Sequence, residues 1–242
     1  MKQKQQASVS LMLMGIVFCI CLVAANLLET KVFHVWGPIS LTCGFIVFPI
    51  SYILNDVIAE VWGFRKARLI IWMGFAMNFF MVALGGIACA LPATVPGSDE
   101  AFKQIFGFMP QVVVASLLAF IVGSFLNALV MSKMKLADRN KGHFDYYFSL
   151  RAVLSTLVGE SADSLIFFPL AFYLFPLIFN GAPQVSFELM VNLMITQVIA
   201  KTAYEILVLP LTIKVVKWVK KYEETDVYDE HISYSAFKIQ EI

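Results

Sequence analysis

Acidic and basic side chains recur along segments that are otherwise apolar, where charges are costly. Glu160 and Asp163 stand three residues apart and therefore share one face of a helix. In a later segment Gln197, Lys201 and Glu205 recur every four residues. Two neighbouring carboxylates in a low dielectric do not both ionise cheaply without a cation between them. We therefore expect these groups to meet, either as a ligand site or as a buried ion pair with Lys201.

Two interpretations of this charge pattern stay open. Lys201 can pair with Glu205 on its own helix, or with the carboxylates of the neighbouring segment, as a purely structural ion pair. Three acids near mid-depth against one base instead favour a ligand that offers hydrogen-bond donors or positive charge. A guanine-like ring fits this chemistry, since its N–H and adjacent amino group lie along one edge, where a carboxylate accepts both.

A second acidic pair, Asp56 and Glu60, stands four residues apart in another apolar run. If a helix begins at residue 39, Asp56 lies about 26 Å along it, near the inner membrane boundary. One interpretation is a solvated interfacial pair neutralised by Arg65 and Arg68. The other is an inner gate or one wall of the ligand site.

Two asparagines, Asn26 and Asn78, supply amide groups inside further apolar runs. Such residues often form only hydrogen bonds between helices. The candidate substrate-binding residues are Asn26, Asp56, Glu60, Glu160, Asp163, Gln197, Lys201 and Glu205.

The elements that must position these side chains are membrane helices. Hydrophobic residues make up 60% of the 242 residues and charged residues only 14%, whereas soluble domains are roughly 45–50% apolar. Crossing the hydrocarbon takes roughly 17–25 apolar residues. Six runs qualify: 11–28, 39–58, 69–91, 112–131, 152–179 and 187–216. The sequence predicts an all-α integral membrane protein with six transmembrane helices.

Loop charges predict the orientation of these spans. With both termini cytoplasmic, the inner segments carry 15 of the 18 Lys and Arg residues and the outer segments only Lys31 and Lys103. This asymmetry is the positive-inside pattern. We expect a transmembrane domain over residues 1–221, in the inner membrane, and a polar, solvated cytoplasmic tail over 222–242 that is largely dispensable for the chemistry.

Several classes of function are disfavoured. The four cysteines lie inside apolar runs without paired metal spacing, and the three histidines fall in loops or the tail. Neither G-x-S-x-G nor H-E-x-x-H occurs. The net charge of +1 gives no sign of nucleic-acid binding. We predict no enzyme activity, no metal or cofactor, and no nucleic-acid partner.

An ordered set of residues across four spans carries a family resemblance. The set comprises Asn26, Lys31, Phe48-Pro49, Asp56, Glu60, Gly63, Arg65-Lys66-Ala67-Arg68, Arg151, Ser155, Gly159-Glu160, Asp163-Ser164, Phe167-Phe168, Gln197, Lys201 and Glu205. With these residues the chain resembles the queuosine precursor transporters, also called the vitamin uptake transporter family. The resemblance covers essentially the whole chain before the tail.

The resemblance implies import of a deazaguanine precursor of queuosine, such as the cyano or aminomethyl base, or of queuine itself. A secondary carrier is the leading hypothesis, with the midplane carboxylates also able to take a proton in each cycle. The alternative is a substrate-binding membrane subunit of an ATP-driven vitamin importer, for which Ala24-Ala25 is a weak signal. The expected partners are a small deazapurine and the lipid bilayer, and spans rich in small residues permit a homodimer.

Overall fold

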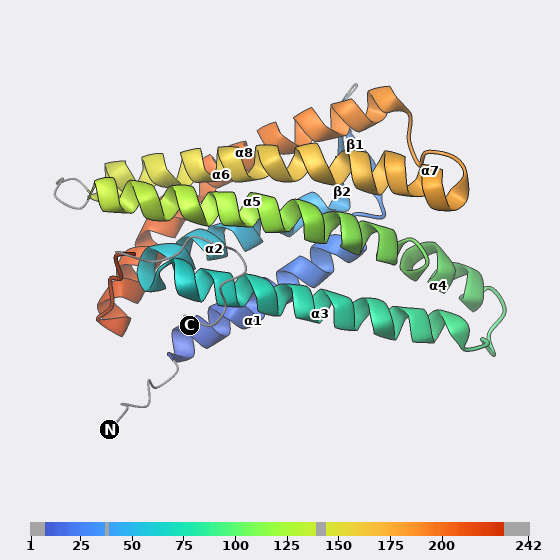
Figure 1. The fold of residues 1–242 in the computed structure, drawn as a ribbon, viewed down its shortest axis with the longest axis horizontal. Coiled ribbons are helices and arrows are strands. Elements are labelled where there is room, and N and C mark those ends of the chain that lie inside the picture. Colours follow the sequence, from blue (N-terminus) through green and yellow to red (C-terminus); the bar gives the residue numbers. More distant parts are fainter. Residues whose placement is uncertain (1–7, 37–38, 139–143, 230–242) are drawn as a thin grey trace.

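The computed structural model describes residues 8–36, 39–138 and 144–229 as a bundle of long helices (Figure 1). The six long helices are α1 (Val9–Leu28), α2 (Phe48–Trp62), α3 (Phe64–Ala90), α5 (Met109–Ala137), α6 (Phe144–Phe168) and α8 (Phe187–Glu223). Shorter elements are β1 (Val32–Trp36), β2 (Ile39–Thr42), the 3-10 turn η1 (Cys43–Ile46), α4 (Ser98–Phe106), the π-helical stretch η2 (Pro169–Leu174) and α7 (Phe175–Asn180). The ends of α2, α5 and α8 gather at one end of the bundle, and α4 and α7 lie at the other.

The predicted second span, 39–58, is wrong in its first half. Strand β2 occupies Ile39–Thr42 and pairs antiparallel with β1, with Phe33 opposite Leu41. The two strands are rich in β-branched and aromatic residues, which favour extended structure. Helix α2 begins only at Phe48, with Pro49 in its first turn, where a missing N–H removes no hydrogen bond. Within the described residues, this hairpin is the one departure from an all-α membrane protein.

Because α2 is short, Asp56 and Glu60 lie at a different depth from the one predicted from the sequence. Its 15 residues span only about 22 Å. Asp56 therefore lies about 12 Å from Phe48, near the middle of the helix, and Glu60 lies close to its end. Twelve of the 15 residues of α2 are buried against neighbouring helices, so both acids lie inside the bundle.

The other predicted spans correspond to helices. Four helical segments are long and apolar enough to cross a membrane: Val9–Leu28, Phe64–Ala90, Ser98–Ala137 and Asp145–Asn180. The last of these widens into η2 at Pro169, because proline has no N–H to continue the α-helical ladder. Large apolar side chains such as Ile20, Phe80 and Leu207 are exposed, as expected for surfaces that face lipid.

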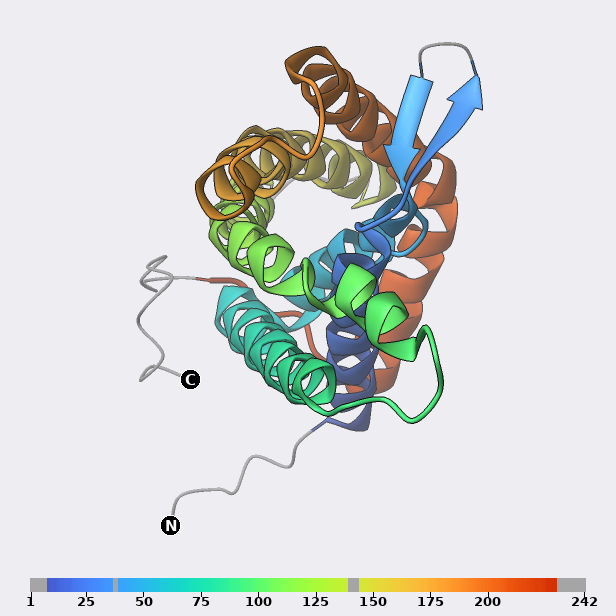
Figure 2. The same cartoon turned by 90° about the vertical axis from the view of Figure 1, so that its right-hand side faces the viewer.

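Close packing of α5 against α6 brings the polar side of α6 into the interior. Gly123 and Gly159 face each other so closely that a Cβ on either would lie 2.8 Å from the other's carbonyl oxygen. Figure 2 shows the bundle end-on, with the β1–β2 hairpin beside α8. These contacts hold α2, α6, α8 and the hairpin around one interior region.

Candidate functional site

A buried ion pair between two helices forms the centre of the site. Lys201 of α8 places its Nζ 3.0 Å from Glu160 Oε2 of α6. The Lys201 Nζ also lies 3.8 Å from the centroid of the Phe48 ring, at the start of α2. A cation over an aromatic face is electrostatically favourable, more so away from water. Three elements therefore converge on one ammonium group.

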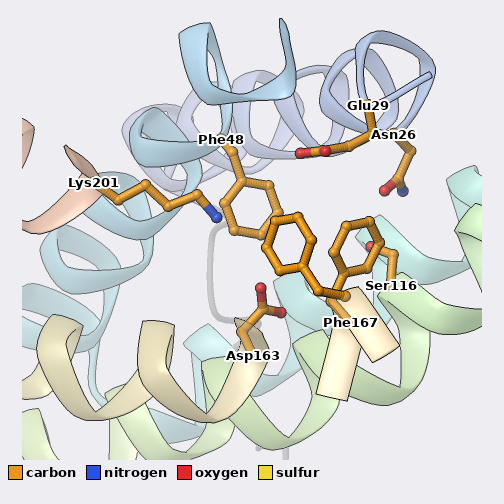
Figure 3. A pocket seen from close by; sticks show the side chains of 8 residues that line it. Asn26, Glu29, Phe48, Ser116, Asp163, Phe167 and Lys201 are labelled. Atoms are coloured by element: carbon orange, nitrogen blue, oxygen red, sulfur yellow. The ribbon is translucent and has the colours of Figure 1, made fainter. Parts of the chain in front are cut away.

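A cavity of about 260 Å³ opens beside this ion pair. Figure 3 shows Lys201, Asp163 and Glu29 arranged around the rings of Phe48 and Phe167. The charge of Lys201 acts on Glu29, Glu160 and Asp163 alike. We call these four residues the central cluster. The lining residues are Asn26, Glu29, Phe48, Ser116, Asp163, Phe167, Phe168 and Lys201.

A second, smaller cavity adjoins the ion pair, and both Lys201 and Glu160 line it. Its volume is about 170 Å³, and it shares Lys201 with the first cavity. Its lining residues are Pro49, Tyr52, Ile53, Thr156, Glu160, Lys201 and Glu205. These volumes include space open to solvent, and the space that a water molecule could occupy is only about 10 Å³ in the first cavity and about 0 Å³ in the second. A bicyclic ligand therefore requires the side chains between the two cavities to move apart.

Several polar atoms around the central cluster lack a hydrogen-bond partner among the described residues. They include Glu160 Oε1, Ser164 Oγ and Gln197 Oε1, all of them buried. Buried polar atoms in proteins almost always have a partner. These atoms are available to a bound ligand or to water.

The remaining candidates lie around this core with partners of their own. Asn127 Nδ2 donates to Asp56 Oδ1 at 2.9 Å, tying α5 to α2. Asn26 Nδ2 donates to Asn78 Oδ1 at 2.6 Å, which is the interhelical hydrogen bond considered above for both residues. Asn26 nevertheless lines the larger cavity.

Gln197 links α8 to the hairpin, since its Nε2 donates to the Thr42 hydroxyl at the end of β2. Because Gln197 precedes Lys201 by one turn, this bond helps to fix the part of α8 that carries the ammonium group. The hairpin therefore belongs to the framework of the site.

Glu60 does not join the central cluster. Its Oε2 lies 3.0 Å from Arg151 Nη2 of α6, and its Oε1 lies 2.7 Å from Lys220 Nζ of α8. Lys135 of α5 approaches to 3.8 Å. Asp56 and Glu60 are both almost fully buried. The interpretation of a solvated interfacial pair is therefore wrong.

The segment after α8 also packs against this end of the bundle. Asp226 Oδ1 lies 2.6 Å from Lys135 Nζ and 3.0 Å from Lys220 Nζ. Asp229 is buried and accepts hydrogen bonds from the Phe64 N–H at 2.9 Å and the Ser132 hydroxyl at 2.5 Å. The expectation of a solvated tail is wrong for Asp229, whereas the side chain of Asp226 is ion-paired but still 41% exposed. The end cluster, as we call it, comprises Glu60, Lys135, Asp138, Arg151, Lys220 and Asp226.

A family model described as "Putative vitamin uptake transporter" matches residues 42–215 of the chain. This range includes the residues of α2, α6 and α8 that line the two cavities. The chain belongs to this family. The resemblance noted from the sequence is thereby confirmed.

Two curated relatives of this vitamin uptake transporter family member are named "Probable queuosine precursor transporter". The protein from Bacillus subtilis (strain 168) is 33% identical over 151 residues, which cover 62% of this chain and 64% of the relative. The protein from Haemophilus influenzae (strain ATCC 51907 / DSM 11121 / KW20 / Rd) is 23% identical over 138 residues, 54% of this chain and 52% of the relative. The chain thus spans between half and two thirds of these relatives' lengths. No solved structure matches.

Part of the cavity wall was not predicted from the sequence of this family member. Glu29 follows Asn26 by three residues and lies on the same helical side, a signal that was present in the sequence. Ser116 carried no such signal, because a lone serine in an apolar helix is common. Phe48 and Phe167 were noted only as part of the resemblance, and their position at the ion pair depends on helix packing.

Proposed function

We propose that this protein is a secondary transporter that imports a queuosine precursor, a deazaguanine base or queuine, across the cell's inner membrane. The observation that carries the proposal is the Lys201–Glu160 ion pair, which lines one small cavity inside a bundle of apolar helices and shares its lysine with a second. The names of the curated relatives support the same substrate class.

The proposed topology has six spans with both termini in the cytoplasm. Helix α8 supplies one of the two spans beyond the four apolar segments, and α2 supplies the other together with the β2–η1 segment that precedes it, because α2 alone is too short to cross the hydrocarbon. The 37 residues of α8 extend about 55 Å, more than the thickness of the hydrocarbon. The excess of Lys and Arg in the segments on the proposed inner side supports this orientation.

The chemistry of the central cluster suits a deazaguanine ring. Its carboxylates outnumber its single cation, so a ligand that donates hydrogen bonds is favoured over one that only accepts them. The rings of Phe48 and Phe167 offer apolar faces to a flat heterocycle. Buried acceptors without partners, such as Glu160 Oε1, add affinity only for ligands that supply a donor.

Transport requires the ligand to pass from one cavity to the other. In the proposed cycle, a ligand donor replaces Lys201 at Glu160, the ion pair parts, and the ion pair re-forms after the ligand has left. A proton on one of the clustered carboxylates would balance the charge while Lys201 is displaced. The exchange of one partner for another keeps the buried carboxylate paired throughout.

The test is uptake of labelled deazaguanine by cells that lack their own synthesis of it. Glu160→Gln and Asp163→Asn are expected to lower uptake at least tenfold, since each removes a charged acceptor. The control is Glu188→Gln, an exposed acid in the first turn of α8, which should leave uptake unchanged. Unchanged uptake in the first two variants would remove the proposed site.

A second measurement addresses the energy source. Purified protein in lipid vesicles is expected to transport the base without ATP or a partner chain. Transport that appears only with ATP and a coupling subunit would instead identify a subunit of an ATP-driven vitamin importer.

A further inference from the structure

Glu29 is a buried carboxylate in the larger cavity to which the proposed transport cycle gives no role. It caps the C-terminal end of α1, directly before the hairpin. Its side chain is almost fully buried, and its Oε2 has no hydrogen-bond partner among the residues described. Gly44 packs against the carboxylate so tightly that a Cβ there would collide with it. The Glu29 carboxylate therefore fits in this place only because residue 44 is a glycine and has no side chain.

Glu29 and Asp163 stand at different ends of the cavity. In the view of Figure 3 the ring of Phe48 lies between the two carboxylates, and Phe167 and Phe168 also line the cavity. Lys201 makes its direct contact with Glu160, so neither Glu29 nor Asp163 receives that ammonium group as a bonded partner. The cavity thus presents two acceptor ends separated by an aromatic middle section.

This arrangement suits a flat heterocycle that carries hydrogen-bond donors at both ends. One end is the N–H and amino edge of the guanine-like ring. The other end differs between the precursors. A nitrile nitrogen only accepts hydrogen bonds and is repelled by a carboxylate, whereas a protonated primary amine donates three and carries the opposite charge.

We propose that Glu29 is a specificity-determining residue that binds a cationic amine substituent at the end of the ligand remote from Asp163. The inference rests on the proposed function, and it selects the aminomethyl deazaguanine base over the cyano base. Asp163 binds the ring edge that both bases share, and Glu29 binds the arm in which they differ.

The experiment measures uptake of the two labelled bases side by side in cells that make neither. Wild-type protein is expected to favour the aminomethyl base. Glu29→Gln should lower uptake of that base about ten- to a hundredfold, as for the loss of a hydrogen bond between charged groups, and change uptake of the cyano base less than about twofold. Asp163→Asn should lower uptake of both. Glu188→Gln serves as the matched control and should change neither.

Two outcomes overturn the inference alone: equal KM values of wild-type protein for the two bases, or an equal loss for both in Glu29→Gln. Failure of wild-type protein to take up either base overturns the proposed function and this inference with it. Glu29→Asp is a second variant for the case that Glu29→Gln does not fold. It keeps the negative charge but places the carboxylate one methylene group farther from the ligand. It should keep the preference with a raised KM for the aminomethyl base, and a lost preference counts against the inference.

Discussion

The central cluster and the end cluster contain the same kinds of buried side chain in different proportions. Around Lys201, three carboxylates share one cation. In the end cluster, three cations meet three carboxylates, and both oxygens of Glu60 contact a cation. Buried charges are tolerated where they are paired. The end cluster meets this condition with its own residues, whereas the central cluster leaves acceptors for another molecule.

The two clusters also join different elements. The end cluster ties α2, α5, α6 and α8 to the segment after α8, through Glu60, Lys135, Arg151, Lys220 and Asp226. The central cluster joins the middle of α6 and α8 to the C-terminal end of α1, and its lysine also contacts Phe48 at the beginning of α2. The end cluster therefore holds the bundle closed at one end, whereas in the proposed transport cycle the residues of the central cluster exchange partners. Substitutions in the two clusters should therefore separate stability from transport.

The largest effect is expected from Lys201→Met. Removing one partner of a buried ion pair costs about 3–5 kcal/mol, because the other charge is left without compensation. The variant should lose that much unfolding free energy, measured on purified protein, and should lose uptake altogether. Adding Glu160→Gln should restore most of the stability, since the stranded carboxylate is gone, but none of the uptake.

A lysine on the same helix provides the control for this prediction. Lys217 pairs with Asp145 at 2.5 Å, and the side chains of both residues are more than half exposed. Exposed ion pairs contribute about 0–1 kcal/mol, so Lys217→Met should change both measurements little. If Lys201→Met had no more effect than Lys217→Met, the central ion pair would have no special role.

The sequence predicted the positions of the helices better than it predicted which side chains contact one another. Five of the six predicted spans overlap long helical segments, and four of these are long and apolar enough to cross a membrane, because length and hydropathy are local properties. The run 39–58 was misread, since an apolar stretch does not by itself separate a buried strand from a helix. Periodicity correctly placed Asp56 and Glu60 on one helical face. It could not show that Asp56 meets Asn127 whereas Glu60 meets Arg151 and Lys220.

The end of the chain illustrates the same limit. Composition alone marks the segment after Glu223 as polar, and polarity suggests solvent. Asp226 and Asp229 instead pair with Lys135 and Ser132, whose availability depends on where α5 ends. No sequence window contains both partners, which lie more than 90 positions apart.

A smaller effect is expected from Glu60→Gln. Its cationic partners lose a buried counter-charge, but Lys220 is 16% exposed and can reach water. The loss should therefore be about 1.5–3 kcal/mol, the contribution of a hydrogen bond to a charged group. Thermal unfolding of purified protein should show this loss, while the Kd for the deazaguanine base should stay within about twofold of wild type. A Kd weakened as strongly as in Asp163→Asn would place Glu60 in the ligand site.

The smallest effect is expected from Asp226→Asn, because the side chain of Asp226 is 41% exposed and such pairs contribute about 0–1 kcal/mol.

The pH dependence of this stability difference is a sharper test than its size. Burial opposes ionisation of Asp226, but hydrogen bonds and charges from Lys135 and Lys220 outweigh it and lower the pKa of its carboxyl below the usual 3.8. A carboxyl whose pKa is lowered by folding stabilises the protein above its unfolded pKa and loses that contribution only as the pH falls through the folded one. The difference in unfolding free energy between wild type and Asp226→Asn should thus be the same at pH 7.5 and pH 5. A difference that did not shrink as the pH fell below 3.8 would mean that the two lysines do not hold this carboxylate, and that the segment after α8 is bound to the bundle through contacts other than Asp226.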